Sequence, residues 1–214
     1  MSKMLELLIK HKIVAIIRGI QDEHADAAAR ALIDGGIALM EITMNTDGAA
    51  DMIYRWRKRF GAEAAIGAGT VTDMATARVA AEAGAQFLIS PNLDEDVIAF
   101  GKEKGISVWP GVMTPTEIVN AVKAGAEAVK LFPMGTLGIG YLREIRGPLN
   151  DIPILATGGA DLHNIGDYLR SGATAVGLGS KLVHMEWIRD GRFDLLREQA
   201  RRFVEAVNTD QTNQ

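Results

Sequence analysis

The chain has no cysteine, no long apolar run and no excess of positive charge. Without cysteine, disulfides, thiolate chemistry and cysteine-ligated metals are excluded. The first residues lack the apolar core of a signal peptide, and no stretch reaches the length of a membrane span. The net charge of −4 gives no basic footprint for nucleic acid or for an anionic membrane. These absences predict a cytoplasmic protein that binds neither nucleic acid nor membrane.

A metal site is not indicated either. The four histidines lie outside the predicted strands, and no histidine and aspartate cluster has the spacing of metal ligands. The chain has a composition typical of globular proteins, with 48% hydrophobic and 23% charged residues over 214 residues. This length and composition predict one domain, residues 1–214. The polar residues 208–214 are expected to form a flexible tail.

A weak internal repeat organises the chain: a helical segment ends in glycine, and a short apolar run follows. Glycine suits the left-handed residue just past a helix, and buried parallel strands read as apolar runs. The predicted strands are 13–18, 37–43, 64–69, 86–90, 106–109, 127–132, 152–156 and 174–179. The predicted helices between them are 22–34, 47–59, 73–83, 94–104, 115–124, 138–146 and 161–170.

Four polar residues stand where helices should begin. Asp73, Asp94, Thr114 and Asp161 are predicted N-caps. A short segment before the first strand is expected to plug one end of the molecule, and Phe193–Val207 has the pattern of a closing amphipathic helix. Eight alternating units without a composition break predict an α/β fold, a closed (β/α)8 TIM barrel. An open doubly wound sheet is the structural alternative.

In such barrels the functional residues follow the carboxyl ends of the strands. Lys130 interrupts the apolar strand 127–132, and burial of its amine would lower its pKa toward the neutral form that attacks a carbonyl. Glu41 lies within another apolar strand and could transfer protons as acid and base. The alternatives are a structural ion pair between Lys130 and Glu41, or a lysine whose ammonium reaches the rim.

Other strand ends supply groups that bind anions. Arg18 can hold a carboxylate or phosphate with its guanidinium fork, although a rim salt bridge is the alternative. Thr70 offers a hydroxyl, and its alternative is a helix N-cap. The turns Gly158-Gly159 and Gly179-Ser180, on consecutive strands, are predicted to present N–H groups to one phosphate. Taken alone, each of these turns is weak evidence for a phosphate site.

The motifs that follow the predicted strands occur in an order seen in one known family. They are Arg18-Gly19, Glu41-Ile42-Thr43, Gly67-Ala68-Gly69-Thr70-Val71, Ile89-Ser90-Pro91, Pro110-Gly111, Lys130-Leu131-Phe132-Pro133 and Thr157-Gly158-Gly159. Over nearly its whole length the chain resembles the KDPG/KHG aldolases, class I aldolases acting on 2-keto-3-deoxy-6-phosphogluconate and 4-hydroxy-2-oxoglutarate.

The resemblance implies a role for each residue. Lys130 would form the Schiff base and Glu41 would transfer protons. Arg18 and Thr70 would hold the pyruvyl carboxylate, with Pro91 and Phe132 lining the pocket. The phosphate would be bound by Gly158, Gly159, Gly179 and Ser180. The resemblance also implies a homotrimer, a small phosphorylated keto acid as substrate, and no metal or organic cofactor.

One position departs from the pattern of some members. They carry an arginine four residues after the glutamate, where this chain has Asn45. In this respect the chain resembles the branch with arginine after the first strand, which includes the phosphogalactonate aldolases. Substrate stereochemistry therefore remains open.

Two other functions are compatible with parts of the sequence. A phosphosugar isomerase, epimerase or thiamine-phosphate-synthase-like transferase would share the glycine turns but would not need a lysine in mid-strand. A regulatory barrel that binds small molecules without turnover would gain nothing from two buried charges.

Overall fold

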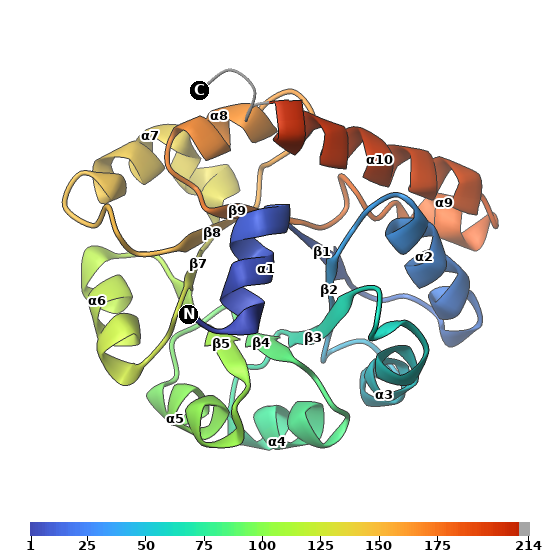
Figure 1. Ribbon diagram of the computed structural model, residues 1–214, viewed down its shortest axis with the longest axis horizontal. Coiled ribbons are helices and arrows are strands. Elements are labelled where there is room, and N and C mark those ends of the chain that lie inside the picture. Colours follow the sequence, from blue (N-terminus) through green and yellow to red (C-terminus); the bar gives the residue numbers. More distant parts are fainter. Residues whose placement is uncertain (210–214) are drawn as a thin grey trace.

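The computed structural model describes residues 1–209, which form a single barrel of strands surrounded by helices (Figure 1). The strands are β1 (Ile13–Ile17), β2 (Leu39–Thr43), β3 (Ala65–Gly69), β4 (Phe87–Ile89), β5 (Ser107–Trp109), β6 (Gly111–Val112), β7 (Val129–Leu131), β8 (Ile154–Thr157) and β9 (Ala175–Leu178). The helices are α1 (Lys3–His11), α2 (Asp22–Asp34), α3 (Ala49–Phe60), α4 (Met74–Glu82), α5 (Glu95–Lys104), α6 (Pro115–Ala124), α7 (Met134–Arg146), α8 (Ile165–Arg170), α9 (Met185–Arg189) and α10 (Phe193–Thr209).

The strands form one parallel sheet in the order β5-β4-β3-β2-β1-β9-β8-β7-β6. Only Pro110 separates β5 from β6. The two segments, which lie at opposite ends of the sheet order, therefore act as one divided strand, and their covalent connection closes the ring of strands. Proline has no N–H for a sheet ladder and interrupts the strand at that point. Its carbonyl still accepts a hydrogen bond from the Lys130 N–H at 2.8 Å. The predicted (β/α)8 barrel is therefore confirmed, with its fifth strand divided.

Alternation along each strand separates two apolar cores. Side chains such as Val129 and Leu131 face outward and pack with the helices, whereas Ala128 faces inward. The inner core contains Phe87 and Trp109, whose ring centroids are 4.8 Å apart. Gly67 makes room for them, because a Cβ there would lie 2.4 Å from the Phe87 ring.

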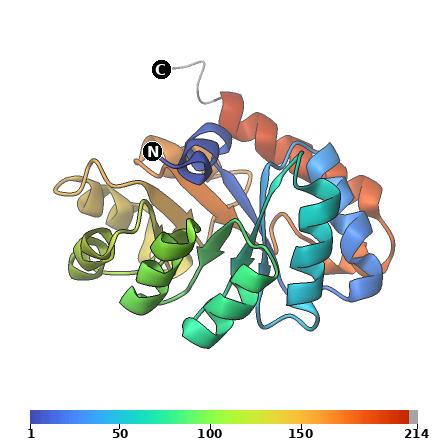
Figure 2. The ribbon, with the colours of Figure 1, turned by 60° about the horizontal axis from the view of Figure 1, so that its bottom comes forward.

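Helix α1 closes one end of the barrel, as predicted (Figures 1 and 2). Its Met4, Leu5 and Leu8 belong to the inner core. Ser2 caps the helix and also donates its hydroxyl to Glu127 Oε2 at 2.5 Å, which ties the plug to the barrel wall. A cavity inside the barrel can therefore open only at the other end, where the strands finish.

Three of the four predicted N-caps are confirmed: Asp73, Asp94 and Thr114 each accept hydrogen bonds from backbone N–H groups of the first helical turn. The prediction for Asp161 was wrong. Its carboxylate accepts from the N–H groups of His163 and Asn164 within a turn, and α8 begins only at Ile165.

Other boundaries also differ from the sequence-based prediction. Helix α7 begins at Met134 and is kinked at Gly138, where the predicted helix was to start. The short helix α9 was not predicted. The closing helix α10 is confirmed and continues to Thr209, so the prediction of a flexible tail was wrong for residues 208 and 209; residues 210–214, the rest of the predicted tail, lie outside the described residues.

Within residues 1–209, no helix combines the length and the apolar character needed to cross a membrane.

Candidate active site

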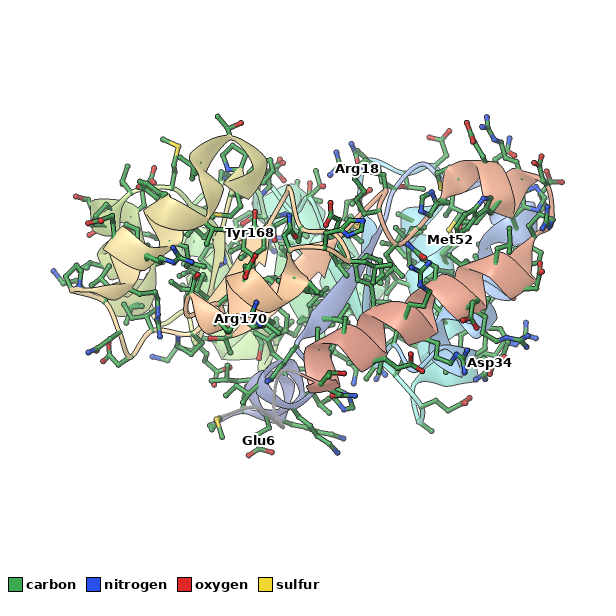
Figure 3. All side chains as sticks on the ribbon, turned by 90° about the horizontal axis from the view of Figure 1, so that it is seen from above. Glu6, Arg18, Asp34, Met52, Tyr168 and Arg170 are labelled. Atoms are coloured by element: carbon green, nitrogen blue, oxygen red, sulfur yellow. The ribbon has the colours of Figure 1, made fainter. Side chains whose placement is uncertain are left out.

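The predicted site residues gather at the end of the barrel opposite α1. Figure 3 shows Arg18 at one end and Glu6, on α1, at the other. Arg18 follows β1, Thr70 follows β3, and Gly158 follows β8. Because the sheet is parallel, residues that follow its strands meet at one rim.

Lys130 is the central residue of β7 and is only 5% exposed. This burial excludes a lysine whose ammonium extends to the rim. Burial lowers the pKa of the Lys130 amine; the Glu41 carboxylate opposes this effect, and the charge of Arg18 adds to it. The Lys130 Nζ lies 5.3 Å from the centre of the Phe132 ring, which is partly exposed at the rim.

Glu41 is the central residue of β2 and is 1% exposed. Its Oε2 has no hydrogen-bond partner within the described part of the chain. Burial raises the pKa of Glu41 to about 7, and the positive charges of Lys130 and Arg18 oppose the rise. A carboxyl with this pKa can both accept and return a proton near neutral pH.

Lys130 and Glu41 are neighbours without being a contact ion pair. Each changes the pKa of the other, yet among residues 1–209 no N···O distance of 4.0 Å or less joins them. The alternative interpretation of both residues, a structural ion pair between Lys130 and Glu41, is therefore excluded. The arrangement leaves an amine and a carboxyl facing the same barrel interior with their reactive atoms free.

Arg18 and Thr70 lie beside one another, with Nη2 of Arg18 3.4 Å from Oγ1 of Thr70. Thr70 has a φ of 57°, a left-handed conformation uncommon for a residue with a β-branched side chain. Its alternative role as a helix N-cap is excluded, because Asp73 caps α4 by accepting from the Thr76 N–H at 2.8 Å. No ion pair involves Arg18 in the described chain, so the rim salt bridge is also absent.

A cavity of about 420 Å³ opens beside Arg18. It is lined by Ile16, Arg18, Thr157, Gly158, Gly159, Ala160, Gly177, Gly179, Ser180, Lys181, Val183 and Met185. All four residues of the two predicted glycine turns are in this lining. In the part of the chain that the structure describes, their backbone N–H groups donate to no protein acceptor, so they are available to an anion.

The remaining two predicted residues lie on the Lys130 side of the rim. Pro91 packs closely on Gly111, where an added Cβ would lie 2.2 Å from the Pro91 carbonyl carbon. Gly111 in turn pairs with Lys130 in the sheet. Phe132 thus lies near the amine and Pro91 contacts the strand next to Lys130, and neither residue lines the glycine-lined cavity.

The family model for the KDPG and KHG aldolases matches residues 4–198 of the chain. The chain belongs to this family. Curated relatives agree: a probable 2-dehydro-3-deoxy-6-phosphogalactonate aldolase of Rhizobium meliloti is 37% identical over 81% of this chain and 82% of its own. The KHG/KDPG aldolase of Escherichia coli K12 is 34% identical over 94% of each chain. The protein is thus an aldolase, a carbon–carbon lyase.

Solved structures also match this aldolase over nearly its full length. The KDPG aldolase from Legionella pneumophila, with pyruvate captured as a covalent carbinolamine, superposes with a TM-score of 0.87 at 29% identity, covering 94% of this chain and 97% of that one. A designed protein cage made by fusing symmetric oligomeric domains matches with a TM-score of 0.89 at 33% identity, covering 95% of this chain and 74% of that one. A thiamine phosphate pyrophosphorylase from Pyrococcus furiosus, at 16% identity and a TM-score of 0.73 over 95% of this chain and 98% of that one, shares the fold alone.

Several residues of the aldolase cavity were not predicted. Thr157 was noted only within a motif, yet its hydroxyl is buried and without a partner among the described residues. Lys181 and Ala160 also line the cavity. Tyr168 and Asn164 lie behind it and donate hydrogen bonds to the carbonyls of the first glycine turn. Ordinary polar residues in predicted helices and loops give no sequence signal of such contacts.

Residues 1–209 contain no group of three or more histidine, aspartate or glutamate side chains that could hold a metal ion.

Proposed function

We propose that this aldolase cleaves a 2-keto-3-deoxy-6-phospho sugar acid into pyruvate and glyceraldehyde 3-phosphate through a Schiff base on Lys130. We propose 4-hydroxy-2-oxoglutarate, which would give pyruvate and glyoxylate, as a second substrate. The observation that carries the proposal is Lys130 itself: an amine almost fully buried at the active end of the barrel, its pKa lowered by that burial, beside a carboxyl of raised pKa.

The reaction follows from these two groups. The neutral amine of Lys130 attacks the C2 ketone, and the carbinolamine loses water to give an iminium, which withdraws electrons from the C3–C4 bond. The Glu41 carboxylate, directly or through a water, accepts the proton of the C4 hydroxyl. The C3–C4 bond then breaks, and its electron pair forms an enamine. The enamine takes a proton at C3, and water hydrolyses the resulting iminium to pyruvate and free Lys130.

The surrounding residues account for binding. Arg18 and Thr70 would hold the carboxylate of the keto acid, because the guanidinium and the hydroxyl lie side by side at the rim. Pro91 and Phe132 would line the pyruvyl pocket near the amine. The phosphate would enter the cavity and accept hydrogen bonds from Gly158, Gly159, Gly179 and Ser180. The reaction as written needs neither a metal nor an organic cofactor.

The stereochemistry at C4 decides between gluconate and galactonate substrates. The similarity of the Rhizobium meliloti protein, and Asn45 in place of an arginine, favour the galactonate epimer. The test is a retro-aldol assay on both phosphorylated epimers and on 4-hydroxy-2-oxoglutarate, measuring pyruvate and the aldehyde separately. We expect equal amounts of pyruvate and glyceraldehyde 3-phosphate from at least one epimer. An enzyme that cleaves neither epimer would contradict the proposed substrate class.

We also propose that the protein is a cytoplasmic homotrimer. The family resemblance supports a trimer, and the match to a cage built from symmetric oligomeric domains supports assembly of some kind. Light scattering on the purified protein should give three times the mass of the chain, whereas a monomer mass would contradict the trimer.

A further inference from the structure

The turn after β8 is held from behind by two side chains that have no assigned role. The Tyr168 hydroxyl donates to the Gly158 carbonyl at 3.3 Å, and Nδ2 of Asn164 donates to the Gly159 carbonyl at 2.9 Å. Neither Tyr168 nor Asn164 lines the cavity on the other side of the turn. The two bonds therefore fix the outer side of this turn.

Fixing these carbonyls also fixes two N–H groups. In a trans peptide the carbonyl and the following N–H point in opposite directions. The bond from Tyr168 therefore turns the Gly159 N–H away from α8, and the bond from Asn164 does the same for the Ala160 N–H. Both residues line the cavity, and neither N–H donates to an acceptor among residues 1–209.

We propose that Tyr168 and Asn164 are positioning residues, which hold the Gly158-Gly159 turn so that the N–H groups of Gly159 and Ala160 bind the substrate phosphate. The inference rests on the proposed function, since it assigns supports to its phosphate site. It adds Ala160 to the groups that bind the anion.

The orientation of the Asn164 amide is determined by its second hydrogen bond. Its Oδ1 accepts from the Asp161 N–H at 2.8 Å, so the amide nitrogen is the atom that faces the Gly159 carbonyl. The Asp161 carboxylate accepts in return from the Asn164 N–H at 3.2 Å. This reciprocal pair holds Asn164 in place before any substrate arrives.

Tyr168 is equally constrained. It is 3% exposed, and burial raises the pKa of its hydroxyl, which keeps the proton available for donation. The conformation of the turn depends on outside contacts, because the adjacent Gly158 and Gly159, with φ values of 96° and 77°, have no side chains and restrict the backbone least. A Cβ at Gly159 would lie 2.7 Å from the Cα of Gly135 and 3.1 Å from the Tyr168 hydroxyl.

The test compares phosphorylated and unphosphorylated substrates. Tyr168→Phe removes only the hydroxyl, and Asn164→Asp replaces a donor with an acceptor that faces a carbonyl. For the phosphorylated substrate we expect Tyr168→Phe to raise KM by about 2- to 12-fold, the worth of one neutral hydrogen bond. Asn164→Asp should raise KM at least as much, because its carboxylate also repels the Gly159 carbonyl, and kcat should be nearly unchanged in both variants. The inhibition constant for inorganic phosphate should rise in parallel, and KM for 4-hydroxy-2-oxoglutarate should stay at the wild-type value.

A matched control is available in Tyr141, whose hydroxyl also donates to a backbone carbonyl, that of Met113, which does not line this cavity. Tyr141→Phe should leave KM for both substrates and phosphate inhibition unchanged. Equal losses on both substrates in Tyr168→Phe and Asn164→Asp would reveal a merely structural role and overturn the proposal, as would an unchanged KM for the phosphorylated substrate.

The same experiment separates this proposal from the proposed function. Trapping with pyruvate and borohydride should label Lys130 in the wild type and in both variants. If the wild type is labelled and cleaves the phosphorylated substrate, while the variants bind phosphate as the wild type does, only the positioning role is wrong. If the wild type itself is not labelled, the proposed Schiff-base mechanism is wrong, whatever the result for the two variants.

Discussion

Glu41 and Gly69 meet across neighbouring strands: a Cβ added to Gly69 would lie 2.3 Å from Oε1 of Glu41. The two residues lie on β2 and β3, which pair in parallel register. Only a residue without a side chain leaves the carboxyl in its place, since an added Cβ would also lie 2.6 Å from the carboxyl carbon of Glu41. Gly69, the last residue of β3, is therefore needed to keep the Glu41 carboxyl in its position.

Gly69→Ala should displace the Glu41 carboxyl and impair proton transfer. We expect kcat to fall by at least about tenfold, approaching the loss of about 10²–10⁴-fold expected when general acid–base help is removed in Glu41→Gln. Trapping of pyruvate on Lys130 should persist, because the amine is untouched. A Gly69→Ala enzyme with wild-type kcat would show that the carboxyl position does not matter.

Glu41→Gln should make the folded protein more stable at alkaline pH. The folded protein holds the Glu41 proton more tightly than the unfolded chain, because burial raises the pKa from 4.5 to about 7. The free energy of unfolding of the wild type therefore loses a contribution as pH rises between these values, at about 1.4 kcal/mol per pH unit and about 3 kcal/mol in total. Urea unfolding at pH 4 and at pH 8 measures the difference. A Gln variant with no greater advantage at pH 8 than at pH 4 would contradict the raised pKa.

The same group should appear in the pH profile of the reaction. If the Glu41 carboxylate accepts the C4 hydroxyl proton, kcat/KM must fall as pH decreases through about 7, where the carboxyl becomes protonated. Lys130 must be neutral to attack, so its titration acts in the same direction and the two are coupled. Glu41→Gln should remove the limb near pH 7 from the residual activity. Retention of that limb in the Gln variant would assign it to another group.

Lys181 should strengthen binding of the phosphorylated substrate through charge alone. It lines the cavity, its side chain is exposed, and no ion pair engages it among the described residues. Lys181→Met should raise KM for the phosphorylated substrate by about 2- to 5-fold at low salt, the range of an exposed charge interaction. The difference should shrink at high salt, where exposed charges are screened. Lys123→Met, on α6, is the control and should change neither value.

Much of the fold was accessible from the sequence because local signals agreed with one another. Apolar runs after glycine predicted the strands, and Asp73, Asp94 and Thr114 accept the cap hydrogen bonds that their positions indicated. Asp161 failed because an aspartate can also close a short turn, and here it bonds to His163 and Asn164. The division of the fifth strand follows from Pro110, whose missing N–H was visible in the sequence but whose effect depends on pairing with neighbouring strands.

The site residues could be predicted from the sequence where a charged side chain interrupts an apolar strand. Lys130 and Glu41 are charged residues in apolar strands, and burial of such residues has few structural reasons. Tyr168 and Asn164 break no pattern, since polar residues are common near the start of a surface helix. Their contacts with Gly158 and Gly159 arise only because the chain after β8 folds back behind the turn. Contacts of that kind depend on loop geometry, which residue types alone do not determine.

The most direct test of the central claim is reductive trapping. The protein is incubated with pyruvate and borohydride, digested, and analysed by mass spectrometry for the site of the covalent adduct. The account predicts one adduct, on the peptide that contains Lys130, together with a Lys130→Ala variant that is folded, forms no adduct and has essentially no turnover. An adduct on another lysine, or a Lys130→Ala enzyme with near-normal turnover, would contradict it.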